Sequence, residues 1–351
     1  MGTRRRPLRV LLTSHAYTVG VNHGRVEVLA AYADLEIALL TPPAWPEFLR
    51  PVPLEKRKAA RYRFAAIPVA FAGRNNAFFY RSLLLPILFR RWRPDIVHIE
   101  QEPYSVVTFQ LLWLARHLTR ARTLVFTWEN YHYQWEQPKR FFEAYALKHA
   151  DGFLAGSRMA AEILQLKAPG AHVEILPMFS LDANLYRPER AEGLRADLGL
   201  TDAFVIGFAG RFVPEKGLET LADALRWLPP QAHLLLIGRG PLRERVERMA
   251  GNQVHIAEAV PHHDVPRYLN CMDVLVLPSR TTPGWREQFG RVLVEAMACG
   301  VPVIGSDSGA IPEVIGDAGL IFPEGNARAL AERLLALMAD ARQRRHLAGA
   351  G

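Results

Sequence analysis

Two glutamates lie in a segment whose residue types suit the binding of a sugar and a phosphate. Glu287 and Glu295 are separated by seven residues, within the run LPSRTTPGWREQFGRVLVEAMACGVPVIG from Leu277 to Gly305. In one continuous helix they would lie about two turns apart, roughly 12 Å along the axis. We expect instead that Glu287 lies in a loop and Glu295 in the helix that follows. A carboxylate accepts two hydroxyl hydrogen bonds, which suits a ribose diol or a sugar. The alternative is two exposed glutamates beside a helix.

The helix of this segment is expected to start near Phe289 and to end at Gly300, since glycine favours the left-handed turn after a helix. At its start, the backbone amides of Gly290, Arg291 and Val292 would point outward, together with the positive end of the helix dipole. Gly290 would let the backbone approach a ligand closely because it has no Cβ. These features predict an anion site of a size that suits a diphosphate.

Two cations follow an earlier strand, in the run Gly207-Phe-Ala-Gly-Arg-Phe-Val-Pro-Glu-Lys-Gly217. Arg211 and Lys216 are five residues apart and come just after the expected strand end. Together they would neutralise a diphosphate leaving group, the arginine as a fork and the lysine as a point charge. Basic residues are also common in loops, so the pair alone is weak evidence.

Short apolar runs alternate with helical patterns in both halves of the chain, which predicts βαβ units and parallel sheets covered by helices on both faces. The expected strands are 9–13, 35–40, 95–99, 123–127, 204–208, 233–237, 274–277 and 303–305, and the expected helices are 25–32, 105–118, 218–225, 243–249, 265–270, 289–299 and 327–347. Turn formers without periodicity fill residues 178–198, which we interpret as a linker. The predicted fold is therefore α/β, with one domain at 1–177 and another at 199–351. Two doubly wound domains of this kind would bind a ligand at the carboxyl ends of their strands, in an interdomain cleft.

Composition excludes several classes of protein. The chain has 351 residues, half of them hydrophobic, which fits two globular domains rather than a disordered or fibrous chain. Its two cysteines, Cys271 and Cys299, give neither a disulfide framework nor a zinc-finger spacing. No apolar run approaches the ~20 residues of a membrane span, and the run after the basic N-terminus is too short for a signal peptide. We therefore expect a cytoplasmic protein.

The net charge of +8 is unevenly distributed along the chain. Residues 1–178 carry 24 basic and 14 acidic side chains, whereas the remainder carries 19 and 21. The excess concentrates in Lys56-Arg57-Lys58, with Arg61 and Arg63, and again in Arg90-Arg91-Trp92-Arg93. Such a half attracts anions, for example nucleic acid, lipid head groups or phosphorylated substrates, unless these residues simply form solvated helix faces.

These motifs together resemble the retaining glycosyltransferases of the GT-B fold, family 4. The resemblance is carried by Gly-Arg-Phe…Glu-Lys-Gly at 210–217, by the Glu-x7-Glu spacing and by Ala-Cys-Gly-Val-Pro-Val-Ile-Gly at 298–305. It covers nearly the whole chain and is densest from about residue 205 to 325. It implies two facing Rossmann-like domains with a nucleotide-sugar donor between them.

The resemblance also implies roles for individual residues. The loop of Gly210, Arg211 and Lys216 would hold the donor diphosphate, and Glu295 would bind the nucleotide ribose. Glu287, with the backbone of Gln288, Phe289 and Gly290, would bind the donor sugar. The following residues complete the implied donor site: Gly238 in a glycine turn, the main chain around Val260 near the base, Arg291 and Val292 at the helix start, and Gly20 in a loop near the phosphates. An ordinary strand-to-helix turn explains Gly20 as well.

The first half departs from the family pattern at a strand end expected to face the cleft. Many relatives have His-x-His here, but this chain has His98-Ile-Glu100, so a histidine's role does not transfer. Glu100 and Glu102 would bind acceptor hydroxyls, or one of them caps the helix that starts near Ser105. After the next strand, Trp128 and Asn130 combine an aromatic face with an amide, which suits a sugar; an aromatic edge of the core is the alternative.

Two further features bear on partners and completeness. Residues 81–92 are apolar with basic ends, which fits either a membrane-surface helix or a buried helix before a strand. Relatives that glycosylate lipid-linked acceptors lie on the inner membrane leaflet through a basic first domain. The family usually ends with a helix that crosses back to the first domain, and no such helix is expected before Gly351.

The overall prediction is a glycosyltransferase that moves a sugar from a UDP- or GDP-sugar to a hydroxyl acceptor with retention of configuration. The acceptor would be a sugar, a lipid-linked sugar or a small molecule, in polysaccharide, glycolipid or other glycoconjugate synthesis. Glu287, Arg211 and Lys216 are the expected catalytic residues. The chain has no Asp-x-Asp motif, so we expect no metal cofactor. We also expect no nucleic-acid partner. The alternatives are a sugar-nucleotide epimerase of the same architecture and a catalytically silent sugar-nucleotide-binding protein.

Overall fold

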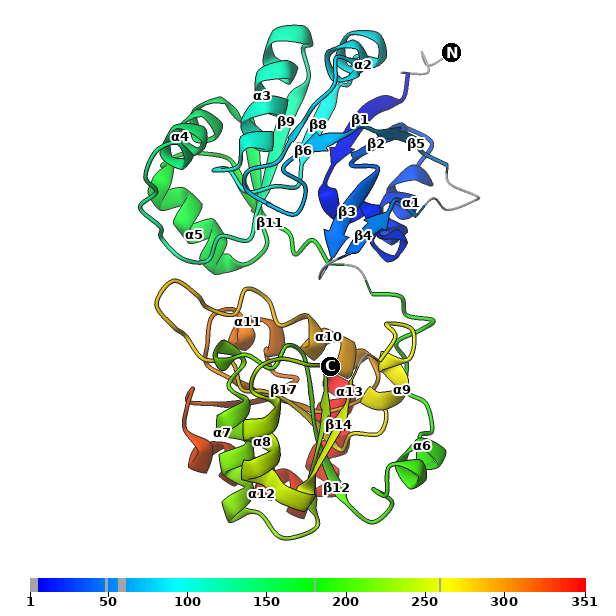
Figure 1. The fold of residues 1–351 in the computed structure, drawn as a ribbon, viewed down its shortest axis with the longest axis vertical. Coiled ribbons are helices and arrows are strands. Elements are labelled where there is room, and N and C mark those ends of the chain that lie inside the picture. Colours follow the sequence, from blue (N-terminus) through cyan, green and yellow to red (C-terminus); the bar gives the residue numbers. More distant parts are fainter. Residues whose placement is uncertain (1–5, 48–49, 56–60, 180, 259) are drawn as a thin grey trace. The chain divides into compact units, whose positions relative to one another are not determined.

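The chain forms two compact α/β units, residues 1–180 and 181–351, in the computed structural model (Figure 1). The structure describes residues 6–47, 50–55, 61–179, 181–258 and 260–351. Each unit has its own core of buried aliphatic and aromatic side chains. None of the described helices is long and apolar enough to cross a lipid bilayer.

The first unit contains a seven-stranded sheet in the order β11-β10-β9-β8-β1-β2-β5, and every neighbouring pair is parallel. Its strands are β1 (Leu8–Thr13), β2 (Leu35–Thr41), β5 (Arg63–Ala66), β8 (Ile96–Ile99), β9 (Arg122–Thr127), β10 (Gly152–Ala155) and β11 (Val173–Ile175). Two short antiparallel ribbons add β3 (Ala44–Glu47) with β4 (Arg50–Pro53), and β6 (Val69–Ala70) with β7 (Phe79–Tyr80). The helices are η1 (His15–Thr18), η2 (Gly20–His23), α1 (Gly24–Ala30), α2 (Leu84–Trp92), α3 (Val106–Leu118), α4 (Lys139–His149) and α5 (Arg158–Lys167).

The second unit contains a six-stranded parallel sheet in the order β14-β13-β12-β15-β16-β17. Its strands are β12 (Phe204–Ala209), β13 (Ala232–Ile237), β14 (Val254–Ala257), β15 (Val274–Leu277), β16 (Val303–Ser306) and β17 (Gly319–Phe322). Its helices are α6 (Glu192–Asp197), η3 (Pro214–Lys216), α7 (Leu218–Ala224), η4 (Leu225–Trp227), α8 (Arg243–Ala250), η5 (Gly251–Gln253), α9 (Val265–Leu269), α10 (Arg291–Ala298), α11 (Ile311–Ile315), α12 (Ala327–Ala339) and α13 (Ala341–Ala350).

The strand orders explain where ligand-binding residues gather. In both sheets the first strand of the unit lies inside the sheet, β1 between β8 and β2 and β12 between β15 and β13. The chain therefore winds outward in both directions from the β1/β8 and β12/β15 pairs. Loops that leave the carboxyl ends of such a pair diverge and leave a crevice, which is where open α/β sheets bind ligands.

Three segments whose structure was predicted from the sequence differ from that prediction. The expected helix 327–347 is two helices, because Asp340 has extended backbone and its side chain accepts the amides of Arg342 and Gln343 at 2.8 and 3.0 Å. The helix expected from Phe289 begins at Arg291, because Gly290 has a left-handed φ of 79°. The segment expected as a linker, 178–198, contains α6, and its Tyr186 is buried in the core of the second unit.

Candidate functional site

The centre of the candidate site in the second unit is an ion pair between Lys216 and Glu287. Lys216 follows β12 and Glu287 follows β15, so they come from the two strands at which the sheet order reverses. Lys216 Nζ lies 2.5 Å from Glu287 Oε2, and Ser279 Oγ donates to the same oxygen at 2.7 Å. The Lys216 and Glu287 side chains are only 16% and 8% exposed. A buried cation and a buried carboxylate are thus held together at the ligand-binding edge of the sheet.

A glycine fixes the position of Lys216. Gly217, the next residue, has a left-handed φ of 66°, and a Cβ at this position would lie 1.8 Å from the carbonyl oxygen of Pro278. Only glycine permits this approach of the loop after β12 to the end of β15. The approach brings Lys216 close to Trp285, whose ring centroid lies 5.2 Å from Nζ.

The second glutamate forms a separate cluster on α10. Arg291 Nε donates to Glu295 Oε1 at 2.7 Å, one helical turn away, and Tyr186 also hydrogen-bonds Glu295. His262 Nε2 lies 3.0 Å from an Arg291 nitrogen. Glu295 is 7% exposed, and burial raises the pKa of its carboxyl group while Arg291 and Tyr186 oppose the shift. Glu295 is therefore held in place by the guanidinium of Arg291, one turn earlier on α10, and by the phenol of Tyr186, which precedes α6 in the sequence.

The remaining residues of the predicted donor site occupy the surrounding loops. Arg211 is 58% exposed, and its guanidinium lies 3.5 Å from Glu215 Oε1. Gly238 packs so closely that a Cβ there would lie 1.9 Å from the carbonyl oxygen of Gly210. The loops after β12 and β13 thus touch through their backbones.

Val260 and Val292 pack against the core, Gln288 is exposed and Phe289 is half-buried. Gly290 is the N-cap of α10 and is buried between Leu277 and Leu293, so the first turn of this helix starts at the site.

In the first unit, Glu100 forms a buried network at the β1/β8 pair. It follows β8, and Tyr17, which follows β1, donates to Glu100 Oε1 at 2.5 Å. Arg25 of α1 forms an ion pair with the other oxygen and also donates to Tyr17 Oη at 2.8 Å and to the carbonyl oxygen of Met178 at 3.0 Å. Burial raises the pKa of Glu100 to about 7, while Arg25 and Tyr17 oppose the shift. The position that departs from the family pattern thus carries a carboxyl group that titrates near neutrality.

The other acceptor residues predicted in this unit are tied to its framework. Glu102 accepts a hydrogen bond from Thr127 and another from the backbone amide of Trp128 at 3.0 Å. Trp128 packs on Gly156, where a Cβ would lie 2.1 Å from the indole ring. Asn130 is 5% exposed. Neither Glu100 nor Glu102 caps α3 through its carboxylate, because both make other hydrogen bonds and the N-cap is Ser105.

Gly20, expected to offer its amide to a donor phosphate, has a different partner. Its amide donates to Glu55 Oε2 at 2.7 Å, and a Cβ at Gly20 would lie 2.8 Å from that oxygen. The amide of Gly20 is thus already hydrogen-bonded to the carboxylate of Glu55. A phosphate would have to displace this carboxylate, and the two negative charges would repel each other.

Comparison with known proteins identifies the family. The profile described as "Glycosyl transferases group 1" matches residues 191–351, and the one described as "Glycosyl transferase 4-like domain" matches residues 19–178. The chain belongs to the group 1 glycosyltransferase family. Among its relatives, a GDP-mannose-dependent monoacylated alpha-(1-6)-phosphatidylinositol monomannoside mannosyltransferase of Corynebacterium glutamicum is 34% identical over 174 residues, 47% of this chain and 46% of the relative. A 2-deoxystreptamine N-acetyl-D-glucosaminyltransferase of Streptomyces fradiae is 30% identical over 73% of this chain and 65% of the relative. The chain thus spans about half to two thirds of these curated relatives.

Solved structures of related fold confirm the architecture of this family member. The UDP complex of Anabaena HepE matches with a TM-score of 0.74 at 18% identity, covering 97% of this chain and 92% of that one. Sucrose-phosphate synthase from Thermosynechococcus elongatus matches with a TM-score of 0.72 at 21% identity over the same shares. The fold class is GT-B, with two Rossmann-like parallel-sheet units, as predicted from the sequence.

Sequence reasoning missed four side chains that this group 1 family member uses to hold its two glutamates. Ser279, Tyr186 and His262 were not singled out, and Arg291 was predicted only through its backbone amide. For Arg291 a signal was present, because it precedes Glu295 by four residues on one helix face. Tyr186 and His262 gave no local signal, because each lies far from α10 in sequence.

The Glu100 network gives a pH-dependent prediction for the first unit of this family member. The pKa of Glu100 is raised in the fold, so unfolding releases a proton between about pH 4.5 and 7, and stability falls as pH rises through that window. Glu100→Gln has no titrating carboxyl group at this position and therefore lacks this loss. Between pH 5 and pH 8, the free energy of unfolding of the variant should rise by up to about 3 kcal/mol relative to that of the wild type. Urea denaturation of the first unit at both pH values measures the difference. Tyr17→Phe removes a hydrogen bond that lowers this pKa, so it should shift the window upward. A constant difference between wild type and Glu100→Gln across this range would contradict the assignment.

Proposed function

We propose that the chain transfers a sugar from a nucleotide-diphosphate donor to a hydroxyl acceptor with retention of configuration, as a step in glycolipid, polysaccharide or other glycoconjugate synthesis. The observation that carries the proposal is the buried Lys216–Glu287 ion pair at the β12/β15 crevice, in a chain of the group 1 glycosyltransferase family. A cation suits the diphosphate of such a donor, and a carboxylate suits the hydroxyls of its sugar.

Donor binding would exchange partners at this pair. A diphosphate carries more charge than Glu287 and would accept hydrogen bonds from Lys216 Nζ, which now donates to the carboxylate. Glu287 would then be available for sugar hydroxyls while Ser279 still orients it. The exposed guanidinium of Arg211 would add a second cation, and Glu295 would accept the ribose hydroxyls, steadied by Arg291 and Tyr186.

The chemical step would be a same-face displacement at the anomeric carbon. The bond from this carbon to the diphosphate oxygen breaks as the bond to the acceptor oxygen forms, and the acceptor proton passes to the departing diphosphate. Lys216, Arg211 and the amide end of α10 would stabilise the charge that develops on the leaving group.

The proposal includes independence from a metal ion, because these groups would provide the positive charge at the leaving group. The location proposed is the cytoplasm, supported by two buried cysteines that form no disulfide.

The relatives support a choice of substrates to test. One is named as GDP-mannose-dependent, and a solved structure of similar fold contains UDP. Incubation of the purified protein with radiolabelled UDP- and GDP-sugars, with and without a glycolipid acceptor, tests the proposal. Transfer or slow donor hydrolysis supports a transferase, whereas an epimerised donor or binding without turnover would overturn it in favour of an epimerase or a silent binding protein.

Replacing Lys216 with alanine should weaken binding of the nucleotide diphosphate by about 1–3 kcal/mol, the range for a lost charged hydrogen bond. The reason is that the Lys216 side chain is only 16% exposed and lies at the crevice, where its ammonium now pairs with Glu287. Titration calorimetry with UDP and GDP measures the effect. Arg226→Ala, on η4, is the control and should leave nucleotide affinity unchanged. Equal affinities of wild type and Lys216→Ala would show that the ammonium does not contact the diphosphate.

A further inference from the structure

Arg291, the first residue of α10, connects the glutamate proposed to bind the ribose to a histidine in another loop. Its Nε donates to Glu295 Oε1 at 2.7 Å, and its Nη2 lies 3.0 Å from His262 Nε2. Glu295 lies one turn later on α10, whereas His262 lies between β14 and α9. One guanidinium therefore joins a buried carboxylate to the loop at the carboxyl end of β14.

The contact with Arg291 requires that His262 be neutral. A guanidinium has only N–H donors, so the imidazole nitrogen that faces it must accept the hydrogen bond. Nε2 of a protonated histidine carries a hydrogen and cannot accept. The proton of neutral His262 must therefore lie on Nδ1. Protonation of the ring would also place a second positive charge 3.0 Å from the guanidinium.

The surroundings of His262 favour this neutral form. Arg291 faces it from α10, Tyr186 from the segment before α6, and His263 from its own loop. Tyr186 Oη lies 3.5 Å from His262 Nε2. Partial burial lowers the pKa of His262 below its ordinary value of 6.5, and the charges of Arg291 and His263 lower it further. At neutral pH the ring is thus an acceptor for the guanidinium.

The charge of Glu295 depends in turn on Arg291. Burial raises the pKa of the Glu295 carboxyl group, whereas Arg291 and the hydroxyl of Tyr186 oppose the shift. Cys299, four residues further on, adds no charge, because burial raises the pKa of its thiol to about 11. Displacement of the guanidinium would therefore favour the protonated, uncharged form of Glu295.

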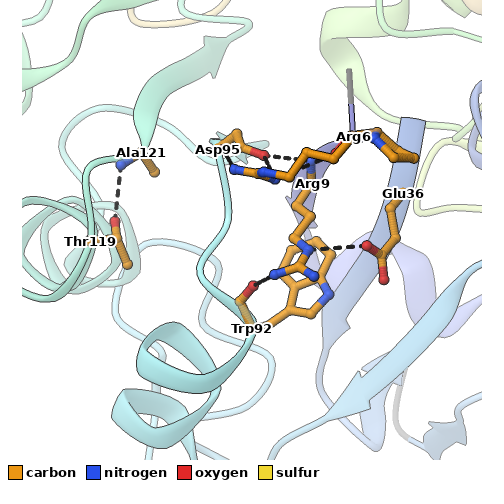
Figure 2. Close-up of polar contacts among 8 residues, drawn as sticks. Arg6, Arg9, Glu36, Trp92, Asp95, Thr119 and Ala121 are labelled. Carbon is orange, nitrogen blue, oxygen red and sulfur yellow. Dashed lines mark hydrogen bonds and ion pairs between the residues drawn. The ribbon is translucent and has the colours of Figure 1, made fainter. Parts of the chain in front are cut away.

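A basic residue of the first unit makes a similar bridge to a partner that does not titrate. The basic run at 56–58 lies outside the described residues, but Arg9 is described. Arg9 Nε donates to Glu36 Oε2 at 3.1 Å, and its Nη1 donates to the carbonyl oxygen of Trp92 at 2.9 Å (Figure 2). A carbonyl oxygen accepts at every pH. The second acceptor of Arg291 is instead an imidazole, which stops accepting when it takes up a proton.

We propose that His262 is a positioning residue of the donor site, which acts through Arg291 to keep Glu295 ionised and oriented toward the ribose hydroxyls. The inference rests on the proposed function, because that function assigns the ribose to Glu295. Neutral His262 accepts a hydrogen bond from Arg291 and holds the guanidinium beside the carboxylate. Protonated His262 repels the guanidinium, and the carboxylate then takes up a proton as well.

This arrangement makes the affinity for the donor sensitive to acid. The pKa of His262 lies below 6.5 and that of Glu295 above 4.5, so the two titrations approach each other. The donor binds the unprotonated pair, so affinity is complete above both pKa values and is lost as pH falls through them. Loss of the charged acceptor should weaken binding about tenfold or more, the range for a charged hydrogen bond.

Titration calorimetry with GDP-mannose and UDP-glucose, between pH 7.5 and pH 5, tests the proposal on the full chain. These sugar nucleotides have no phosphate monoester, so their own charge is constant in this range. For the wild type we expect affinity for the sugar nucleotide that binds to fall about tenfold toward pH 5. An affinity that is constant or rises toward pH 5 would overturn the proposal.

Two variants separate the hydrogen bond from the histidine ring. His262→Gln keeps an acceptor oxygen that does not titrate, so it should bind as the wild type does at pH 7.5 and lose less affinity toward pH 5. His262→Leu has no acceptor and should bind about threefold to tenfold more weakly at pH 7.5, the range for a neutral hydrogen bond. In transfer assays this loss should raise the KM for the donor and leave kcat unchanged.

His263→Leu is the matched control. His263 lies in the same loop, but its side chain is 76% exposed and lies 3.5 Å from Asp264. This variant should keep the wild-type affinity at pH 7.5 and lose it toward pH 5 as the wild type does. Equal affinities of His262→Leu and the wild type at pH 7.5, or a wild-type pH profile in His262→Gln, would show that His262 does not position Glu295.

The positioning role and the proposed sugar transfer fail in distinguishable ways. Sugar transfer and nucleotide affinity that the His262 variants leave unchanged would overturn the positioning role alone. The expected pattern of affinities in a protein that transfers no sugar would overturn the proposed transfer alone. A wild type that binds neither sugar nucleotide at pH 7.5 would overturn both.

Discussion

Glu287→Gln is expected to reduce kcat/KM for sugar transfer about 100-fold, or roughly 3 kcal/mol, which is near the upper range for a charged hydrogen bond. Glutamine keeps the size of the side chain and one acceptor oxygen but removes the charge. The variant therefore loses the ion pair with Lys216 at 2.5 Å and the carboxylate proposed to bind sugar hydroxyls. Initial rates with the donor identified by the radiolabel assay measure the change.

Two companion variants make this prediction specific. Glu332→Gln on α12 alters a glutamate that is 66% exposed and pairs with Arg328 one turn away, so activity should not change. Ser279→Ala removes the hydroxyl that orients Glu287 at 2.7 Å and should have a smaller effect than Glu287→Gln. Wild-type rates for Glu287→Gln in a correctly folded protein would remove this residue from the proposed mechanism.

Lys167→Met is expected to destabilise the first unit by about 3–5 kcal/mol, the cost of leaving a buried charge without its partner. Lys167 at the end of α5 lies 2.7 Å from Glu129 and 2.6 Å from Glu143. Its side chain is 6% exposed, and those of the glutamates are 3% and 13% exposed. Burial raises the pKa of Glu129 to about 7, and Lys167 opposes that shift. Without the ammonium, two carboxylates would face each other in the core.

Urea denaturation with hydrogen exchange in each unit measures the loss and assigns it to the first unit. Lys148→Met on α4 removes an exposed lysine and should change stability by no more than about 0.5 kcal/mol. Adding Glu129→Gln and Glu143→Gln to Lys167→Met should restore most of the stability, because no unpaired charge then remains. A loss from Lys167→Met no larger than that of the control would show that the network does not stabilise the unit.

Many elements of the fold were predictable because their signals are local. The expected strand 274–277 has the same bounds as β15, and the helix expected at 265–270 ends one residue later than α9. The prediction of one helix over 327–347 was wrong, because the apolar periodicity continues across Asp340. In the structure Asp340 has extended backbone and caps the start of α13, which the periodicity does not reveal. The strands β5, β10, β11, β14 and β17, of three or four residues each, were not predicted.

The sequence by itself determined that the chain is an α/β protein of the group 1 glycosyltransferase family, through the Glu-x7-Glu spacing and the glycines around Arg211 and Lys216. It placed Glu287 in a loop and Glu295 in a helix, as the structure shows. Only the tertiary structure decided which charges meet. Lys216 pairs with a glutamate 71 residues away, Arg25 with one 75 residues away, and the amide of Gly20 with one 35 residues away. Local periodicity fixes which face of an element is buried, but the partners of a charge depend on strand order, which brings the ends of distant strands to one edge of a sheet.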